Sequence, residues 1–169
     1  CIRDRSKAKA TLLGSGAILN EVIKAQDILQ TKYGIAADVW SVTSYKELYT
    51  DCISTDRWNM LNPSGQKLSY VEQCLDEAIV VVAACDYLKA LPCSIAKWIP
   101  GRLMPLGTDG FGRSDSRQAL REYFEVDARF ITVAALYGLV QEGRIDGQVL
   151  EKAIEDFDID PEKIDPVTI

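Results

Sequence analysis

The stretch from Leu106 to Arg117 reads L-G-T-D-G-F-G-R-S-D-S-R and holds three of the eleven glycines of the chain. A short apolar run precedes it at Arg102 to Leu106, and a helical pattern follows it from Ser116 to Glu125. We therefore expect a strand, a glycine-rich turn and a capped helix in that order. Asp115 is expected to cap the free amides of this helix, with Gln118 completing a capping box.

The glycines of this stretch allow backbone angles that a β-carbon forbids, so the loop should fold tightly. Phe111 stands between two of them and needs a surface to pack against, in its own domain or in a neighbour. A glycine-rich turn at a helix N-terminus can also cradle a phosphate. The charges of the loop balance, however, which favours an architectural or interface role over anion binding. The predicted interface loop comprises Gly107, Thr108, Asp109, Gly110, Phe111, Gly112, Arg113 and Asp115.

Outward from this loop, strand and helix patterns alternate along the chain. The candidate strands are Ala10 to Leu13, Ala37 to Val42, Ile79 to Ala84 and Arg102 to Leu106, with a fifth candidate in the N-terminal segment. The other candidate helices are Ile18 to Tyr33, Ser44 to Tyr49, Tyr70 to Glu77, Tyr87 to Trp98, Val126 to Glu142 and Val149 to Phe157, of which Val126 to Glu142, capped by Asp127, is the longest. The alternation predicts a three-layer α/β/α fold with a mostly parallel sheet of about five strands.

The predicted organisation is a linker or the end of a preceding strand at residues 1–9, an α/β domain at 10–145, and a C-terminal helix with an acidic, extended tail at 146–169. Residues 50–69 break the helical pattern and contain a Pro63-Ser64-Gly65 turn, so we expect an irregular insertion there. Trp58, Met60 and Leu61 are expected to pin this insertion to the body of the domain. The alternative is that they form part of a subunit contact.

Two further polar positions follow predicted strands. The turn at residues 14–16, Gly-Ser-Gly, resembles part of a dinucleotide fingerprint, but the third glycine position falls on Leu19 and the acid expected after the second strand is missing. A close strand-to-helix turn is therefore the favoured interpretation. Asp86 follows a strand at the edge where open α/β sheets bind ligands. Because aspartate is also a favoured helix cap, we expect it to cap the next helix.

Composition narrows the class of protein. The chain has 169 residues, of which 47% are hydrophobic and 26% charged, as expected of one soluble domain. The net charge of -6 argues against general nucleic-acid binding. No apolar run reaches the ~20 residues that a membrane span needs. The five cysteines form no C-x-x-C pair, which is typical of reduced thiols in a cytoplasmic setting.

The sequence lacks the usual signs of a self-contained active site. It contains no histidine, which excludes a histidine base or metal ligand within this chain. It also shows no nucleophile beside a base, no phosphate-binding P-loop and no cluster of metal ligands. We therefore predict no catalytic, cofactor-binding or metal-binding residue here. The chain begins at Cys1 without an initiator methionine, so we expect it to be a piece of a longer polypeptide.

Several segments together resemble one family. They are L-L-G-S-G from Leu12, D-V-W-S-V-T-S from Asp38, D-R-W-N from Asp56, C-D-Y-L-K from Cys85, the stretch from Leu106 to Arg117, F-E-V-D from Phe124 and V-A-A-L from Val133. In this order they resemble the C-terminal domain of the homodimeric type of pyruvate dehydrogenase, and the resemblance covers about the whole chain. One departure is Asn62, where the family often has histidine.

The resemblance implies a transketolase-like C-terminal domain that packs against its dimer partner and the preceding domains of the same chain. Thiamine diphosphate, magnesium and the catalytic residues would lie in those preceding domains of a cytoplasmic enzyme. That enzyme would decarboxylate pyruvate and pass the acetyl unit to a lipoyl group of the dihydrolipoyl acetyltransferase component. Two alternatives stay open. One is a free-standing module that binds a small anion or nucleotide at residues 14–16, Asp86 and residues 108–114, and the other is a partner-docking domain.

Overall fold

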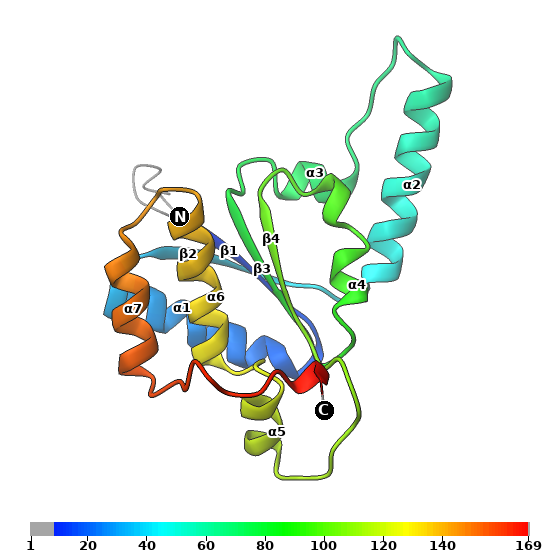
Figure 1. Ribbon diagram of the computed structural model, residues 1–169. Helices are drawn as coiled ribbons and strands as arrows, with labels where there is room; N and C mark the ends of the chain where they lie inside the picture. The colour runs from blue at the N-terminus through cyan, green and yellow to red at the C-terminus, as the bar shows by residue number, and fades with distance from the viewer. Residues whose placement is uncertain (1–8, 169) are drawn as a thin grey trace.

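The computed structural model describes residues 9–168 and shows a parallel sheet between two layers of helices (Figure 1). The strands are β1 (Lys9–Gly14), β2 (Ala36–Ser41), β3 (Val80–Ala84) and β4 (Arg102–Leu106), in the order β2-β1-β3-β4. All three pairings are parallel, which confirms the predicted α/β/α architecture. The described residues form four strands. The fifth candidate falls in residues 1–8, outside them, and Lys9 begins β1 instead of ending a linker.

The central strand β3 is buried on both faces, because its side chains alternate between two cores. Val80, Val82 and Ala84 belong to one apolar cluster, while Val81 and Ala83 belong to the other. Successive side chains of a strand point to opposite faces of its sheet. A run of apolar residues without alternation is therefore what a strand covered by helices on both sides requires.

The first face of the sheet is covered by long helices. They are α1 (Leu19–Tyr33), α6 (Ala128–Gln141) and α7 (Gly147–Asp156), with the short α5 (Arg117–Tyr123) at one end. Leu29 of α1 and Leu136 of α6 are completely buried in this core, and Ala153 brings α7 into it. The predicted cap of α6 is confirmed, since Asp127 accepts bonds from the amides of Arg129 and Phe130.

The second face is covered by α2 (Tyr45–Leu61), α3 (Tyr70–Cys74), α4 (Ala90–Cys93) and the 3-10 turn η2 (Ala96–Trp98). Two further 3-10 turns are η1 (Gly16–Ile18) and η3 (Pro166–Thr168). Tyr45, Val71 and Ile95 pack here against β1 and β3. No helix among residues 9–168 is long and apolar enough to cross a membrane.

The predicted irregular insertion is wrong over most of its length. Helix α2 has 17 residues and continues through it to Leu61. No glycine or proline occurs between Tyr45 and Asn62. Asn62 precedes Pro63, and a residue that precedes proline is disfavoured in the helical conformation, so the helix ends there. We call residues 57–68 the arm. Figure 1 shows the end of α2 and the returning loop projecting away from the sheet.

The expectation that the arm is pinned to the body is also wrong. Trp58, Met60 and Leu61 remain 44%, 74% and 56% exposed. The helix extends beyond the sheet, so these side chains have no core to enter. The distal half of α2 has no helical hydrophobic pattern because it buries little against the body of the domain, not because it is irregular.

Smaller details of the helices also differ from the sequence predictions. Helix α3 ends at Cys74 and not at Glu77. The helix predicted from Tyr87 begins only at Ala90, because residues 87–89 bond to the interface loop. Asp86 therefore caps no helix. Helix α6, with 14 residues, is shorter than α2.

The C-terminal tail is less extended than the sequence indicates. After α7 the chain returns past the junction of α5 and α6 to the interface loop, where it forms η3 (Figure 1). Pro166 is buried there. The two prolines and the acidic residues predict an exposed tail, but a contact with a distant loop leaves no local signal in a sequence.

Candidate interface loop and the carboxyl edge of the sheet

The interface loop leaves β4 at the carboxyl edge of the sheet, where it is bonded to the segment that follows β3. The amide of Cys85 donates to the Leu106 carbonyl at 3.1 Å, and the amide of Thr108 donates to the Tyr87 carbonyl at 2.8 Å. The Lys89 amide donates to Oδ1 of Asp109 at 3.0 Å. These bonds hold the first half of the loop in one position on the body.

Gly107 is required by a close approach between two backbone segments. A β-carbon at this position would lie 2.5 Å from the carbonyl oxygen of Tyr87 and 3.0 Å from the amide nitrogen of Lys89. Backbone atoms cannot move aside as a flexible side chain can. A glycine therefore lets the segments after β3 and β4 lie against each other.

Gly110 is required for a second reason. Its φ is +92°, a conformation that side chains with a β-carbon rarely adopt, and a β-carbon there would lie 2.8 Å from the Pro166 carbonyl oxygen. The C-terminal segment thus braces the middle of the loop.

The tip of the loop carries an apolar side chain without a partner in the described chain. Phe111 is 82% exposed, more than any other bulky apolar side chain among residues 9–168. Gly112 beside it has open space around it. Beyond the tip, the guanidinium of Arg113 lies 4.2 Å from the centre of the Tyr123 ring. The loop therefore presents Phe111 outward from a backbone that is anchored on both sides.

The predicted cap of the following helix is displaced by one residue. Ser116 is the N-cap of α5, and its hydroxyl accepts from the Ala119 amide at 3.2 Å. Asp115 instead accepts from the Ser116 amide at 2.6 Å. The predicted capping box with Gln118 does not form, because the cap begins one residue later than expected.

The turn at residues 14–16 connects β1 to α1 at the same edge of the sheet. The Ser15 amide donates to the Ala84 carbonyl at 3.2 Å. A β-carbon on Gly14 would lie 2.8 Å from Cδ1 of Leu19, so helix and strand are in close contact. This geometry confirms the strand-to-helix turn. Gly16, with φ of +57°, faces Asp86, and a β-carbon there would lie 3.3 Å from its Oδ1.

The two buried thiols among the described residues are not activated. Burial raises the pKa of the Cys85 thiol and that of the Cys52 thiol. Protonated thiols are poor nucleophiles at neutral pH. Burial likewise raises the pKa of the Tyr45 phenol, whose hydroxyl has no hydrogen-bond partner among the described residues. None of these groups is suited to act as a nucleophile or base.

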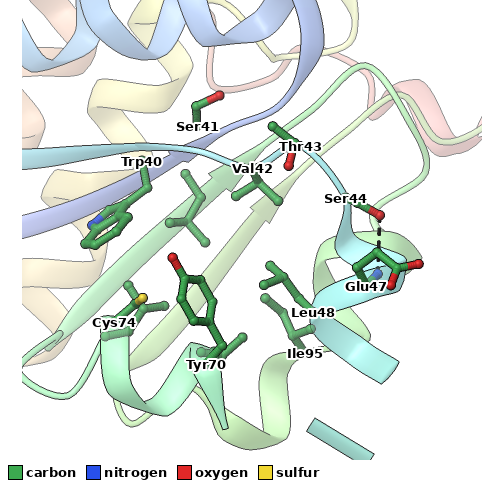
Figure 2. A pocket seen from close by; sticks show the side chains of 13 residues that line it. Trp40, Ser41, Val42, Thr43, Ser44, Glu47, Leu48, Tyr70, Cys74 and Ile95 are labelled. Atoms are coloured by element: carbon green, nitrogen blue, oxygen red, sulfur yellow. Dashed lines mark hydrogen bonds between the residues drawn. The ribbon is translucent and has the colours of Figure 1, made fainter. Parts of the chain in front are cut away.

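A hollow of about 270 Å³ lies on the second face, between the end of β2, the start of α2 and α3. Figure 2 shows the aromatic side chains of Trp40 and Tyr70 beside it, with Leu48 and Ile95 completing an apolar wall. The Ser44 hydroxyl is used as the cap of α2, accepting from the Glu47 amide at 3.2 Å (Figure 2). No lysine or arginine among the described residues lines this hollow. It suits an apolar side chain better than an anionic substrate.

Sequence reasoning missed two features of the surface. One is the arm, whose helical nature was indicated by the absence of glycine and proline between Tyr45 and Asn62. The other is a group of arginines on one side of α5. The four-residue spacing of Arg117 and Arg121 was the available signal for two of them, because such spacing places helical side chains on one face. Arg113 precedes the helix, so this spacing does not place it.

Comparison with known proteins identifies the class. Residues 1–127 match the transketolase-like TK C-terminal domain, and the chain belongs to this family. Its fold is also similar to that of a solved protein described as "Split gene transketolase, inactive beta4 tetramer". That match has a TM-score of 0.54 and 19% identity, and covers 79% of this chain and 40% of the other.

Among curated proteins, the chain is similar to pyruvate dehydrogenase E1 components. It is 48% identical over 159 residues to that of Pseudomonas aeruginosa, which covers 92% of this chain and 18% of the relative. It is 46% identical over 163 residues to that of Escherichia coli K12, covering 95% of this chain and 18% of the relative. For Mycolicibacterium smegmatis the identity is 39% over 159 residues, covering 93% and 17%. The chain thus spans about a fifth of the length of these relatives.

Proposed function

We propose that the chain is the C-terminal domain of a cytoplasmic pyruvate dehydrogenase E1 component, and that it serves the packing of that enzyme. The identity of 38–48% over 92–99% of the chain supports the parentage. The whole enzyme would decarboxylate pyruvate with thiamine diphosphate and magnesium. It would then transfer the acetyl unit to a lipoyl group of a dihydrolipoyl acetyltransferase.

The cofactor does not fit the residues of this chain. No group of three or more carboxylate, thiol or imidazole side chains among the described residues is placed to hold a metal ion. The chain has no histidine, and the charges facing the hollow on the second face are not those of a diphosphate site. We therefore assign thiamine diphosphate and magnesium to the rest of the enzyme and derive no chemical step on this domain.

The exposed Phe111 carries the packing proposal. Its loop is bonded to the body at Thr108 and Asp109 and braced at Gly110, so the ring is held outward at little further entropic cost. Burying a phenylalanine side chain that is otherwise in water contributes about 1.5–3 kcal/mol. We propose that the ring inserts into the preceding domains or into the dimer partner.

The arm supplies a second surface for the same purpose. Trp58, Met60, Leu61 and Leu68 are all exposed on it. Apolar side chains that cluster on a projecting element typically mark a contact with another protein surface. Since pinning to the body is wrong, the alternative of a subunit contact is the one that this exposure supports.

The packing role is tested by Phe111→Ala in the full polypeptide. We expect the dissociation constant of the dimer to rise about tenfold or more, with a matching loss of activity at low enzyme concentration. Analytical ultracentrifugation measures the first and pyruvate turnover the second. Tyr137→Ala is the matched control, because Tyr137 is an exposed ring on α6, away from the loop. Unchanged dimerisation and activity in Phe111→Ala would remove this role.

The parentage is tested by assaying pyruvate decarboxylation with thiamine diphosphate and magnesium. The full polypeptide should release carbon dioxide from pyruvate and acetylate the lipoyl group of the acetyltransferase, whereas residues 1–169 alone should do neither. Turnover by residues 1–169 alone would contradict the proposal. So would a full polypeptide that prefers another 2-oxo acid.

A further inference from the structure

A second hollow, of about 290 Å³, lies at the carboxyl edge of the sheet between η1, the interface loop and α5. We call it the arginine pocket. Ile18, Phe124 and Val126 line it and are buried, so they form an apolar floor. The remaining lining is mostly polar or charged and more exposed; it consists of Ala17, Asp86, Thr108, Gly112, Arg113, Arg117, Leu120 and Arg121. The pocket thus combines an apolar floor with a charged rim.

Two of the three arginines are fixed in place. Nη1 of Arg121 lies 3.0 Å from Oε1 of Glu21, and its Nη2 donates to the Ala17 carbonyl at 3.4 Å. Arg113 stacks on the ring of Tyr123, as described above. Planar guanidinium groups held in this way keep free N–H donors for a ligand at little further cost in entropy.

The third arginine has no anionic partner among the residues that the structure describes. Arg117 is exposed at the start of α5 and makes no ion pair with residues 9–168. It lies one helical turn before Arg121, and like charges at this spacing repel each other. An anion between the two would remove that repulsion.

The charges that line the pocket do not balance. Three arginines face one carboxylate, that of Asp86. Glu21 lies outside the lining and is shared between Arg121, Lys24 and the amide of Ala128. The excess is positive but small, which suits a single negative charge better than a diphosphate.

We propose that the arginine pocket binds a small organic acid with one carboxylate and an apolar body. The carboxylate would bond to Arg117 and Arg121, since arginine presents paired donors that match a carboxylate. The apolar body would lie on Phe124 and Val126. A volume of about 290 Å³ is close to the lower end of the range for ligand pockets, so the ligand is small.

This site is independent of the proposed parentage and packing. It uses Asp86, Thr108 and Arg113, which sequence reasoning connected with anion binding, but not the turn at residues 14–16. Its charge comes from Arg117 and Arg121, which lie after the interface loop. A failure of the Phe111 test would therefore leave it unaffected.

The probe is 4-phenylbutyrate, with its neutral amide, 4-phenylbutanamide, as the matched ligand. Isothermal titration of the full polypeptide measures both affinities, and hydrogen exchange of peptides from residues 107–126 locates the site. We expect the carboxylate to bind at least tenfold more tightly than the amide and to protect these peptides. Equal affinity for the two ligands, no binding up to about ten millimolar, or protection only elsewhere would overturn the proposal.

Two variants and one control complete the test. Arg117→Gln should weaken binding of 4-phenylbutyrate about tenfold, the effect of one charge-assisted hydrogen bond. Ala17→Phe should block the pocket from its exposed side and abolish binding. Arg144→Gln removes the same charge from an exposed position after α6 and should leave the affinity unchanged. Equal affinities of wild type and Arg117→Gln for 4-phenylbutyrate would refute the role of the arginines. Displacement of the probe by equimolar inorganic phosphate would refute the claim that the apolar body of the ligand contributes to binding.

Discussion

The interface loop and the arm both expose apolar side chains, but the structure holds them in different ways. The loop depends on the body, because its hydrogen bonds go to the segment that follows β3 and Gly110 lies against the C-terminal segment. The arm holds itself. Nδ2 of Asn59 donates to the Lys67 carbonyl at 2.9 Å, and its Oδ1 accepts from the Lys67 amide at 2.8 Å. The ammonium of Lys67 also lies 3.6 Å from the centre of the Trp58 ring.

Contacts with the body therefore determine the position of the interface loop, whereas contacts within the arm determine the local order of the arm. The loop can be displaced by a change far away in the sequence, at any residue that anchors the body around it. The arm can lose its order only through residues within it or at its base, where Asp56 accepts from Nε1 of Trp98 at 3.0 Å. Substitutions at each site should therefore affect one surface and leave the other intact.

The largest expected effect is at Glu21, which connects α1 to both helices that follow the loop. Its carboxylate accepts from Arg121 of α5 and from the Ala128 amide of α6. Glu21→Ala would leave a mostly buried guanidinium without its anionic partner and a buried amide unpaired, so we expect the free energy of unfolding to fall by about 3 kcal/mol. Urea unfolding measures it. Glu122→Ala, which removes an exposed partner of Arg129, is the control and should cost less than about 1 kcal/mol.

The same carboxylate predicts a pH dependence. Burial raises the pKa of Glu21, but hydrogen bonds from Lys24 and the Ala128 amide, with the charges of Lys24 and Arg121, outweigh it, and the pKa lies below its usual 4.5. A carboxyl whose pKa is lower in the folded state than in the unfolded state stabilises the fold when the pH is above the unfolded-state pKa. This stabilisation is lost as the pH falls through the folded-state pKa. The stability difference between wild type and Glu21→Gln should hold above about pH 5 and shrink below pH 4.5. A constant difference down to pH 3 would contradict this.

The next effect is at Gly107, within the loop itself. Gly107→Ala places a β-carbon against two backbone segments, and overpacking of this kind costs about 1–3 kcal/mol. Gly112→Ala is the matched control in the same loop, because open space surrounds that position. Thermal unfolding should show a lower midpoint for the first variant and little change for the second. Equal midpoints would mean that the loop is not held against the segment after β3.

The same contrast explains what the sequence could predict. The loop was predictable because its cause is local: glycines, a strand before them and a helix start after them. The four strands and the alternating layers follow from hydrophobic pattern, which reports burial. The position of the interface loop was not predictable, because Gly110 lies against Pro166, which is distant in the sequence.

The arm was mispredicted for the opposite reason. A hydrophobic pattern detects a helix only where one face is buried, and the end of α2 buries little. Its helix is stabilised by the absence of breakers and by bonds from Asn59 that no periodicity reveals. The N-cap at Ser116 instead of Asp115, and the absence of a helix capped by Asp86, show that the sequence does not fix which residue caps a helix. Several neighbouring polar residues are equally good caps by composition.

A moderate effect is expected at Asn59, confined to the arm. Asn59→Ala removes both side-chain bonds to Lys67, each worth about 1 kcal/mol. Amide exchange of residues 62–68 should become several-fold faster, while peptides of the interface loop stay unchanged. Thr50→Ala is the control, because its hydroxyl bonds only to the Lys46 carbonyl within α2. Faster exchange at residues 107–115 would break the separation between the two surfaces.

The smallest effects are expected at the exposed side chains themselves. Phe111 and Met60 are 82% and 74% exposed, so Phe111→Ala and Met60→Ser should change the free energy of unfolding of residues 1–169 by less than about 0.5 kcal/mol. Urea unfolding of each variant measures this. A larger loss in either would mean that the side chain already packs within the chain. If the free energy of unfolding is unchanged but the full polypeptide assembles more weakly, these side chains stabilise contacts outside this domain. A side chain that contributes nothing to the stability of its own domain can affect assembly only through its contacts with a partner.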